Sequence, residues 1–488
     1  MSEGPRAQPK ALYYLLATQG FASFAFYNTL ALFVLYLTRE LGFADSEAFL
    51  IFGTYVAFAY LSDVAGGLLA DRLLGFRNCI CTGLLMVSLG YFLLLSDSNW
   101  GLFVALATAA VGRGFFGSNI AAMLGSFYDE HDTRRDSGFT YFYMGINCGS
   151  LLAFVGAGIL ATQIDYKVAF CLSGVGATLG LVVFLAGRRH YDRRGIVPEA
   201  SPLRGDAGRR VSAVLAVGGA CMLAIVGTAF LIRFNLVGGQ ILAVFSAGFF
   251  GYFLFEMVGE TRVIRKKLYA FLILVFFAVI FGILYQQSNA SVVLYIAREV
   301  DLEVSGILVP PSDVGSLNPF FVLILAPIFA LVWRRMATVG RAVSIPGKFT
   351  IGLMLLAASY GVLSMDGLFS GVENDGSLFR VVLYFLLLTM GELCLSPIGL
   401  AMAAALAPQR LRGFAMGLWM LSHAISDYLA GLISGWAHVP SETDLEDSRV
   451  IYEEAFIDYG LICIASALIL LALVPILKRL MGRQAIGT

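Results

Sequence analysis

Charged residues are scarce in this sequence: Asp, Glu, Lys and Arg together make up 14% of its 488 residues. A soluble domain carries about 25% charged residues. With 59% hydrophobic residues and a mean hydropathy of +0.81, this composition excludes an ordinary soluble protein. The apolar runs are long and continuous, unlike the short alternating strands of a membrane barrel. The chain is therefore predicted to be an all-α membrane protein.

Sequence features of enzymes and cofactor proteins are also missing. The seven cysteines show no pairing or metal-ligand spacing, so we interpret them as buried free thiols. No Gly-rich phosphate loop, metal cluster or nucleophile elbow stands out. The first apolar stretch, about 26 residues long, exceeds the core of a secretory signal peptide. We expect no enzymatic activity, no catalytic residue, no cofactor, no metal and no nucleic-acid partner.

Apolar runs of about 20 residues, the length that crosses a bilayer as a helix, recur along the whole chain. Of the 33 Lys and Arg residues, 26 fall in loops on the side of both termini and six on the other side, while Arg113 lies inside a run. This asymmetry predicts a multi-pass protein of the inner (plasma) membrane with both termini cytoplasmic. The fourteen predicted spans are 12–37, 47–69, 79–95, 101–127, 139–163, 168–187, 211–232, 235–257, 268–287, 317–335, 349–370, 377–404, 411–437 and 452–478.

Two basic loops divide the predicted spans into two blocks of six and an inserted pair. The predicted domains are 1–187, a linker 188–267 with spans 211–232 and 235–257, and 268–488. An internal echo supports the two blocks, because the fifth helix of each opens with a similar sequence, "RRDSGF" and "QRLRGF". Six-helix repeats of this kind are a transporter architecture.

Several motifs carry a resemblance to known transporters. "GGLLADRLLGFR" (66–77) resembles the loop after helix two of the major facilitator superfamily. "FYMGINCGS" (142–150), "SLNPFFVLILAP" (316–327), "GELCLSPIGL" (391–400) and "MGLWMLSHA" (416–424) resemble helices five, eight, ten and eleven of the proton-dependent oligopeptide transporter family. The resemblance implies the major facilitator fold, two six-helix halves plus two inserted helices, and a peptide symporter with protons as coupling ion.

The resemblance also implies a substrate site. The amino end of a peptide is expected at Asn147, Asn318 and Glu392, since a carboxylate and two amide oxygens suit an ammonium group. Hydrogen bonding between helices is the alternative for these three residues. Four aromatic residues match pocket positions or replace a polar one, with ordinary packing as the alternative: Trp419, Tyr27, Tyr60 and Tyr285, the last in place of a helix-seven glutamate.

Other parts of the family pattern are absent. Helix one of the family reads Glu-x-x-Glu-Arg-Phe-x-Tyr-Tyr, whereas this chain has "QGFASFAFY" (19–27), without either glutamate or the arginine. Gly117 replaces the lysine of helix four. The carboxylate-binding and proton-coupling site is therefore expected to be non-standard.

Arg113 is the residue expected to compensate. An arginine at the depth of hydrocarbon costs roughly 3 kcal/mol on insertion scales, so it needs a function. It precedes Gly117 by four residues, which places both on the same helix face. We expect its planar guanidinium to bind a substrate carboxylate. The alternative is a charge pair between helices, for example with Asp63.

The remaining charges suggest proton coupling and gating. Asp63, Glu392, and His423 with Asp427 are the candidate proton-coupling groups. Pairing of His423 with Asp427 within their helix is the alternative for those two. Three residues of the loop after helix two are expected to form a gate, with an ordinary charged turn as the alternative: Asp71, Arg72 and Arg77.

The sequence thus predicts a monomeric secondary transporter in the lipid bilayer that moves a small peptide-like, amine-bearing substrate by alternating access. Two alternatives stay open. The cargo of an importer or exporter could be a modified peptide, a siderophore or a polyamine-like metabolite. The protein could also be a transport-dead receptor.

Overall fold

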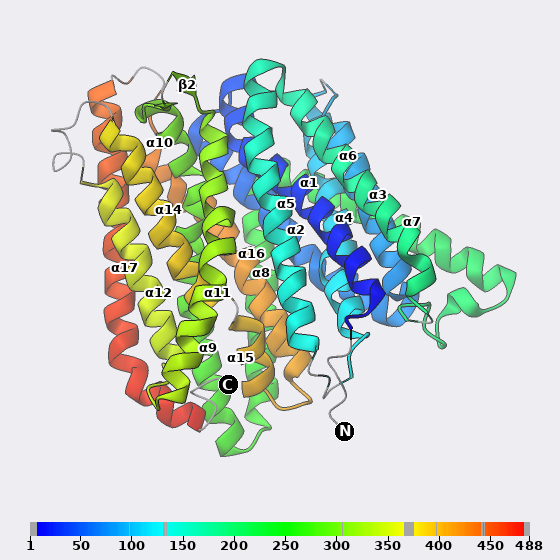
Figure 1. Ribbon diagram of the computed structural model, residues 1–488. Helices are drawn as coiled ribbons and strands as arrows, with labels where there is room; N and C mark the ends of the chain where they lie inside the picture. The colour runs from blue at the N-terminus through cyan, green and yellow to red at the C-terminus, as the bar shows by residue number, and fades with distance from the viewer. Residues whose placement is uncertain are drawn as a thin grey trace. The chain divides into compact units, whose positions relative to one another are not determined.

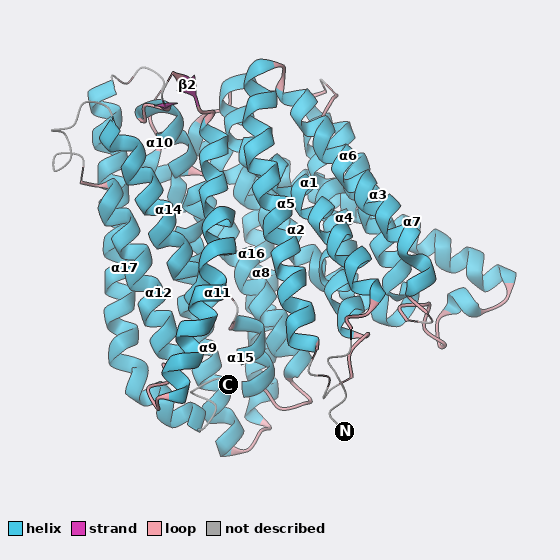
Figure 2. Cartoon of the chain, in the orientation of Figure 1, coloured by secondary structure: helices cyan, strands magenta, loops and turns pink. Residues whose placement is uncertain are grey.

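The computed structural model describes residues 7–96, 98–129, 132, 134–192, 194–304, 306–365, 375–396, 398–440, 443 and 445–482. Within these ranges the chain is almost entirely helical (Figure 2), with one short antiparallel pair of strands, β1 (Glu303–Val304) and β2 (Ile307–Leu308). Twelve helical stretches of the described chain are long and apolar enough to cross a membrane.

The described residues contain fourteen long helices. Asp45–Leu93 contains two, α2 and α3, and α16, which carries His423 and Asp427, is not among the twelve. The number agrees with the sequence prediction. The long helices (Figure 1) are α1 (Lys10–Leu35), α2 (Asp45–Leu69), α3 (Gly75–Leu93), α4 (Asn99–Gly125), α5 (Arg135–Gln163), α6 (Tyr166–Ala186), α7 (Ala207–Arg233), α8 (Asn235–Val258), α9 (Arg262–Tyr285), α11 (Leu317–Thr338), α12 (Ile345–Leu363), α14 (Asp375–Leu395), α16 (Arg412–Ile433) and α17 (Leu445–Met481).

Some predicted boundaries are wrong. The span predicted over 377–404 is two helices, α14 and the short α15 (Gly399–Leu406). Pro397, itself outside the described residues, falls between them, and a proline removes a backbone donor and disfavours helix at the residue before it. The span predicted over 268–287 ends at Tyr285 and is followed by α10 (Ser291–Glu299), which the sequence did not predict. The last five residues of the span predicted over 349–370 lie outside the described residues.

Contacts divide the chain into two compact units. Unit 1 is Met1–Phe33 with Thr54–Gly238, and unit 2 is Val34–Gly53 with Gly239–Thr488. The inserted helices are thereby shared, α7 with unit 1 and all but the first turn of α8 with unit 2. The boundaries predicted at residues 187 and 267 separate sequence repeats from a linker, whereas these units are defined by contacts. The predicted domains therefore stay a prediction.

Glycine lets the helices of unit 1 approach closely. A Cβ atom at Gly83 of α3 would lie 2.7 Å from the carbonyl oxygen of Gly112 on α4, too close for any side chain. Close approach at small residues is how helices associate in lipid, where no hydrophobic effect drives them together. It brings α4, which carries Arg113, against α3, and α7 also packs against α4.

Unit 2 is built around α12, which packs on α14 and α17, and around the pairs α9 with α16 and α11 with α14. Gly391 of α14 makes the α12 contact possible, because a Cβ there would lie 2.9 Å from the carbonyl oxygen of Gly352. These contacts fix Glu392, the next residue of α14, relative to α9 and α11.

The basic linker after α6 is ordered against unit 1. Arg77 donates from Nε to the carbonyl oxygen of Arg194 at 2.7 Å and from Nη2 to that of Asp192 at 2.5 Å. The Ser201 hydroxyl donates to the carbonyl oxygen of Leu73 at 2.7 Å. Tyr191 beneath Arg77 is buried, and burial raises the pKa of its phenol above the ordinary value. The Arg77 cation therefore binds backbone carbonyls of the linker.

Candidate functional site

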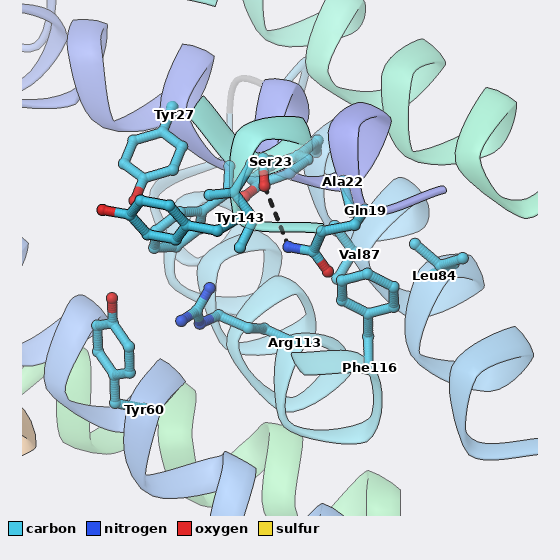
Figure 3. A pocket seen from close by; sticks show the side chains of 13 residues that line it. Gln19, Ala22, Ser23, Tyr27, Tyr60, Leu84, Val87, Arg113, Phe116 and Tyr143 are labelled. Atoms are coloured by element: carbon cyan, nitrogen blue, oxygen red, sulfur yellow. Dashed lines mark hydrogen bonds between the residues drawn. The ribbon is translucent and has the colours of Figure 1, made fainter. Parts of the chain in front are cut away.

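Unit 1 contains a cavity of about 270 Å³ between helices α1 to α5. Its floor is mixed, with one cation, several hydroxyls and an amide among aromatic and aliphatic side chains (Figure 3). Mixed polar and apolar walls are typical of small-molecule sites. The lining residues are Gln19, Ala22, Ser23, Phe26, Tyr27, Tyr60, Leu84, Val87, Tyr91, Arg113, Phe116, Tyr143 and Ile146.

Arg113 extends from α4 into this cavity between two aromatic rings. Its guanidinium carbon lies 4.3 Å from the ring centre of Phe26 on α1 and 4.3 Å from that of Tyr60 on α2. Cation–π contacts of this kind contribute about 0.5–2 kcal/mol each, more when water is excluded. The side chain is still 21% exposed, so the cavity reaches it. Because the two rings occupy its neighbourhood, an anion would approach the guanidinium through its N–H edge.

Asp63 of α2 is a loose partner for this cation. Arg113 Nη2 lies 3.9 Å from Asp63 Oδ2, too far for a hydrogen bond. Arg113 Nε and Asp63 Oδ1 are both buried and have no hydrogen-bond partner among the described residues. The charge pair that the sequence left open as an alternative is thus present in an incomplete form, and the cation keeps donors for another anion.

The hydroxyl and amide groups of the cavity surround the same space. Figure 3 shows the hydroxyls of Tyr27, Tyr60 and Tyr143 turned toward the space that the Arg113 guanidinium enters. Gln19 Nε2 donates to Ser23 Oγ at 3.1 Å, while Gln19 Oε1 is buried without a hydrogen-bond partner among the described residues. These groups offer hydrogen bonds to a polar ligand beside the guanidinium.

A second polar centre lies in unit 2 around Glu392. The Tyr285 hydroxyl of α9 donates to Glu392 Oε2 at 3.0 Å, and Asn318 Nδ2 of α11 donates to the same oxygen at 2.9 Å. Asn318 Nδ2 also donates to Thr389 Oγ1 at 3.0 Å. The structure therefore brings together three of the predicted substrate residues, Tyr285, Asn318 and Glu392.

The predicted residues of α16 lie on a neighbouring part of unit 2. Asp427 Oδ1 accepts from Gln286 Nε2 at 2.6 Å. The His423 ring meets the Trp419 ring edge to face at 5.5 Å between centres. Trp419 is almost fully buried and packs directly over Gly399 of α15, where any Cβ would collide with its ring. Trp419 thus has a clear packing function in this structure.

Asn147 belongs to unit 1, separately from Asn318 and Glu392. Its Nδ2 donates to the carbonyl oxygen of Tyr143, one turn earlier on α5, at 3.0 Å. It is buried and does not line the cavity, although Tyr143 and Ile146 do.

The three predicted gate residues have different surroundings. Asp71 and Arg72 are exposed in the π-helical turn Ala70–Leu74, and neither has an ion pair within 4.0 Å among the described residues. Arg77 donates hydrogen bonds to the linker carbonyl oxygens of Arg194 and Asp192. The gate stays a prediction for all three.

Sequence reasoning missed several residues of these sites. Tyr143 lines the cavity and stands in the quoted motif "FYMGINCGS", which could have signalled it. Gln19, Ser23 and Phe26 belong to the helix-one segment 19–27, which was described from sequence only by its missing glutamates and arginine. Thr389 and Gln286 bind predicted residues across helix contacts that no local pattern encodes. No group of three or more His, Cys, Asp or Glu in the described chain is arranged to hold a metal ion.

Comparison with known proteins shows which family this chain belongs to. The sequence matches the POT family over residues 77–451. The chain belongs to the POT family. It is 32% identical over 480 residues to dipeptide and tripeptide permease B of Xenorhabdus bovienii, covering 98% of this chain and 97% of the relative. It is 33% identical over 486 residues to dipeptide and tripeptide permease B of Edwardsiella piscicida, with the same coverage of 98% and 97%.

Solved structures of this POT family share the fold. A peptide transporter POT in complex with sulfate has a TM-score of 0.84 and 30% identity, covering 98% of this chain and 97% of that one. A POT family transporter in complex with 5-aminolevulinic acid has a TM-score of 0.83 and 25% identity, covering 96% and 97%. The protein is a multi-pass membrane transporter with the major facilitator fold, as predicted from the sequence.

Proposed function

We propose that this POT family member is a secondary transporter of peptide-like, amine-bearing substrates, working by alternating access of its two six-helix halves. The observation that carries the proposal is the Arg113 cavity, in which a partly exposed cation has an Nε donor without a hydrogen-bond partner among the described residues and faces hydroxyl and amide groups. A carboxylate-bearing cargo supplies the missing acceptor. The dipeptide and tripeptide permeases related to this chain make a small peptide the first cargo to test.

Arg113 is proposed to bind the carboxylate end of the cargo. A guanidinium offers two parallel N–H donors that match the two oxygens of a carboxylate, and such charge-assisted pairs are stronger than neutral hydrogen bonds. The rings of Phe26 and Tyr60 hold the fork in one orientation. Tyr27, on the same cavity wall, adds a hydroxyl.

Glu392 is proposed to bind the ammonium end. Tyr285 and Asn318 support its carboxylate with neutral hydrogen bonds, and no Lys, Arg or His lies within 4.0 Å of it among the described residues. Asn147 is proposed to contribute an amide oxygen to the same end, and Trp419 an aromatic surface.

Protons are the proposed coupling ion. Four groups within the spans are able to carry them: Asp63, Glu392, His423 and Asp427. We further propose that the protein acts as a monomer in the inner membrane, with both termini cytoplasmic and the loop of Asp71, Arg72 and Arg77 at the cytoplasmic gate. The orientation of the termini is inferred from the positive charge of the loops on that side.

Counterflow in proteoliposomes tests the transport function. Vesicles loaded with unlabelled L-alanyl-L-alanine should accumulate the labelled peptide transiently, because a carrier trades one for the other across the membrane. A receptor would bind the peptide, detected as a rise in melting temperature, without any exchange. No binding and no exchange with this and a wider peptide, amino-acid and siderophore library would refute the proposal.

A further inference from the structure

The two oxygens of the Glu392 carboxylate are not equivalent. Both donors, the Tyr285 hydroxyl and Asn318 Nδ2, bind Oε2. Oε1 has no hydrogen-bond partner among the described residues. Unlike Asp63 Oδ1, it is also not fully buried. One oxygen is thus held by the protein and the other is open.

The negative charge of this carboxylate is not balanced by a nearby cation. Its two donors are neutral, and no cationic side chain of the described chain lies within 4.0 Å. Lys348 Nζ of α12 lies 5.1 Å from the Trp333 ring centre. Arg380, on α14 itself, is twelve residues away, about 18 Å along the helix axis.

The other titratable groups on the helices that pack against α14 are likewise occupied or remote. The Tyr360 hydroxyl of α12 donates to the carbonyl oxygen of Leu284 at 2.5 Å. Tyr384, on α14 itself, lies eight residues before Glu392, about 12 Å along the helix axis, with its ring against that of Tyr360. Arg334 and Arg335 lie at the far end of α11, about 24 Å along the axis from Asn318. The cations of α9 lie in its first two turns, at the end opposite Tyr285: Arg262, Arg265, Lys266 and Lys267.

We infer that a proton and the ammonium group of the cargo compete for Glu392 Oε1. This inference rests on the proposed binding of the amino end at Glu392. A proton on Oε1 makes the carboxyl neutral and removes the charge that attracts an ammonium. Conversely, the ammonium N–H groups need an ionised oxygen, so binding breaks the O–H bond of a protonated Glu392 and releases that proton to water.

This competition fixes the sign of the linkage at Glu392. A proton bound there weakens amine binding, and an amine bound there lowers proton affinity by the same factor, since linkage is reciprocal. Glu392 therefore cannot carry a proton in the same step as an amine-bearing cargo. A co-transported proton has to be carried by another group. Asp63 is one such group, and its carboxylate is only loosely paired with Arg113.

Tyr285 acts as a positioning residue in this account. Its hydroxyl stabilises the ionised carboxylate and directs Oε2 away from the cargo, which leaves Oε1 as the single acceptor. Without that hydroxyl the protonated carboxyl is favoured. The loss of amine affinity should then begin at a higher pH while the affinity at high pH changes little.

Calorimetry of the full-length protein in lipid nanodiscs tests the inference. L-alanyl-L-alanine is titrated between pH 5 and 8 in pairs of buffers with different ionisation enthalpies, which measures proton release. N-acetyl-alanyl-alanine, whose amine is blocked, is the matched ligand. Binding of the free dipeptide should release protons and weaken by up to about tenfold per pH unit on the acid side. The blocked ligand should lack this component.

Three variants complete the test. Glu392→Gln should abolish the proton release and its pH dependence, and the infrared band of a protonated carboxyl that disappears on binding in the wild type should be absent. Tyr285→Phe should move the acid limb to higher pH, whereas Tyr459→Phe, which removes another buried hydroxyl of unit 2, should leave it in place. Proton uptake that depends on Glu392, or no Glu392-dependent proton change, would overturn the inference. Unchanged dipeptide affinity of Glu392→Gln at every pH would instead overturn the proposed amino-end site.

Discussion

Asp63 and Gly117 share one space between α2 and α4. A Cβ atom at residue 117 would lie 2.5 Å from Asp63 Oδ1, so a side chain at this position would displace the carboxylate from its place beside Arg113. The Ser118 hydroxyl of α4 donates to the backbone carbonyl oxygen of Asp63 at 3.2 Å and so joins α4 to α2 at the same place. Asp63, Gly117 and Arg113 therefore share one contact region between α2 and α4.

Replacing Gly117 by alanine should destabilise the protein through this contact. We expect Gly117→Ala to cost about 1 kcal/mol, the low end of the range for overpacking, because the displaced atom is the end of a side chain, visible as a lower melting temperature. The cost should shrink when Asp63→Ala is added, because the colliding carboxylate is gone. Gly218→Ala on α7, where a Cβ meets nothing within 4 Å, is the control and should be nearly neutral. Equal effects in both backgrounds would contradict the shared space.

Arg113 should discriminate cargo by its carboxylate. Arg113→Lys should weaken binding of L-alanyl-L-alanine because the bidentate fork is lost, and Arg113→Ala should weaken it roughly ten- to a hundredfold, as hydrogen bonds to charged groups contribute about 1.5–3 kcal/mol. The C-amidated dipeptide should bind the wild type poorly and be indifferent to Arg113→Ala.

Arg233 offers a matched control for that measurement. It also lies over two rings, 5.4 Å from the Phe103 centre and 5.8 Å from the Phe234 centre, but outside the cavity. Arg233→Ala should leave dipeptide affinity unchanged. If Arg113→Ala binds free and amidated peptides as the wild type does, Arg113 only links helices and the anion site lies elsewhere.

Gradient-driven accumulation should depend on a separate proton carrier. We expect Asp63→Asn, or neutralisation of His423 or Asp427, to abolish accumulation driven by a proton gradient while sparing counterflow, which needs no net proton movement. Both are measured with labelled dipeptide in the same proteoliposomes. Accumulation that survives loss of Asp63, Glu392, His423 and Asp427 together would show that protons are not coupled through these groups.

The proposed gate makes a different kind of prediction. Asp71→Asn should shift the resting population toward the inward-open state, because a charge that helps to close the cytoplasmic side is lost. The measurement is the labelling rate of Cys81, which is partly buried at the start of α3. A labelling rate equal to that of the wild type would indicate that Asp71 lies in an ordinary turn.

The fold was predictable from sequence because each span is encoded locally. An apolar run of sufficient length has to form a helix in lipid, where backbone groups find no other hydrogen-bond partners. The errors fall where hydropathy alone does not mark the end of a helix. The apolar run through 377–404 conceals the break between α14 and α15, and α10 extends beyond the run that marks α9.

The sites were predictable only in part. Resemblance indicated Asn318 and Glu392, and a hydrogen bond joins them in the structure; that they bind the cargo stays a prediction. No sequence period encodes that Phe26 and Tyr60 flank Arg113, because three helices meet there through close packing at glycines such as Gly66, which faces Gly114. Nor does any local pattern encode that Tyr285 and Asn318 converge on one oxygen.

The inserted pair α7 and α8 has a consequence for how this protein could have evolved. Each helix is built into a different unit, α7 against α4 and α8 against α16, where Glu256 binds Arg410 at 2.6 Å and Phe249 packs on Phe414. A single inserted helix would invert every span that follows it and place the loop charges of unit 2 on the wrong side of the membrane. Gain or loss of this insertion therefore has to proceed in steps of two helices, even though the two members serve different units.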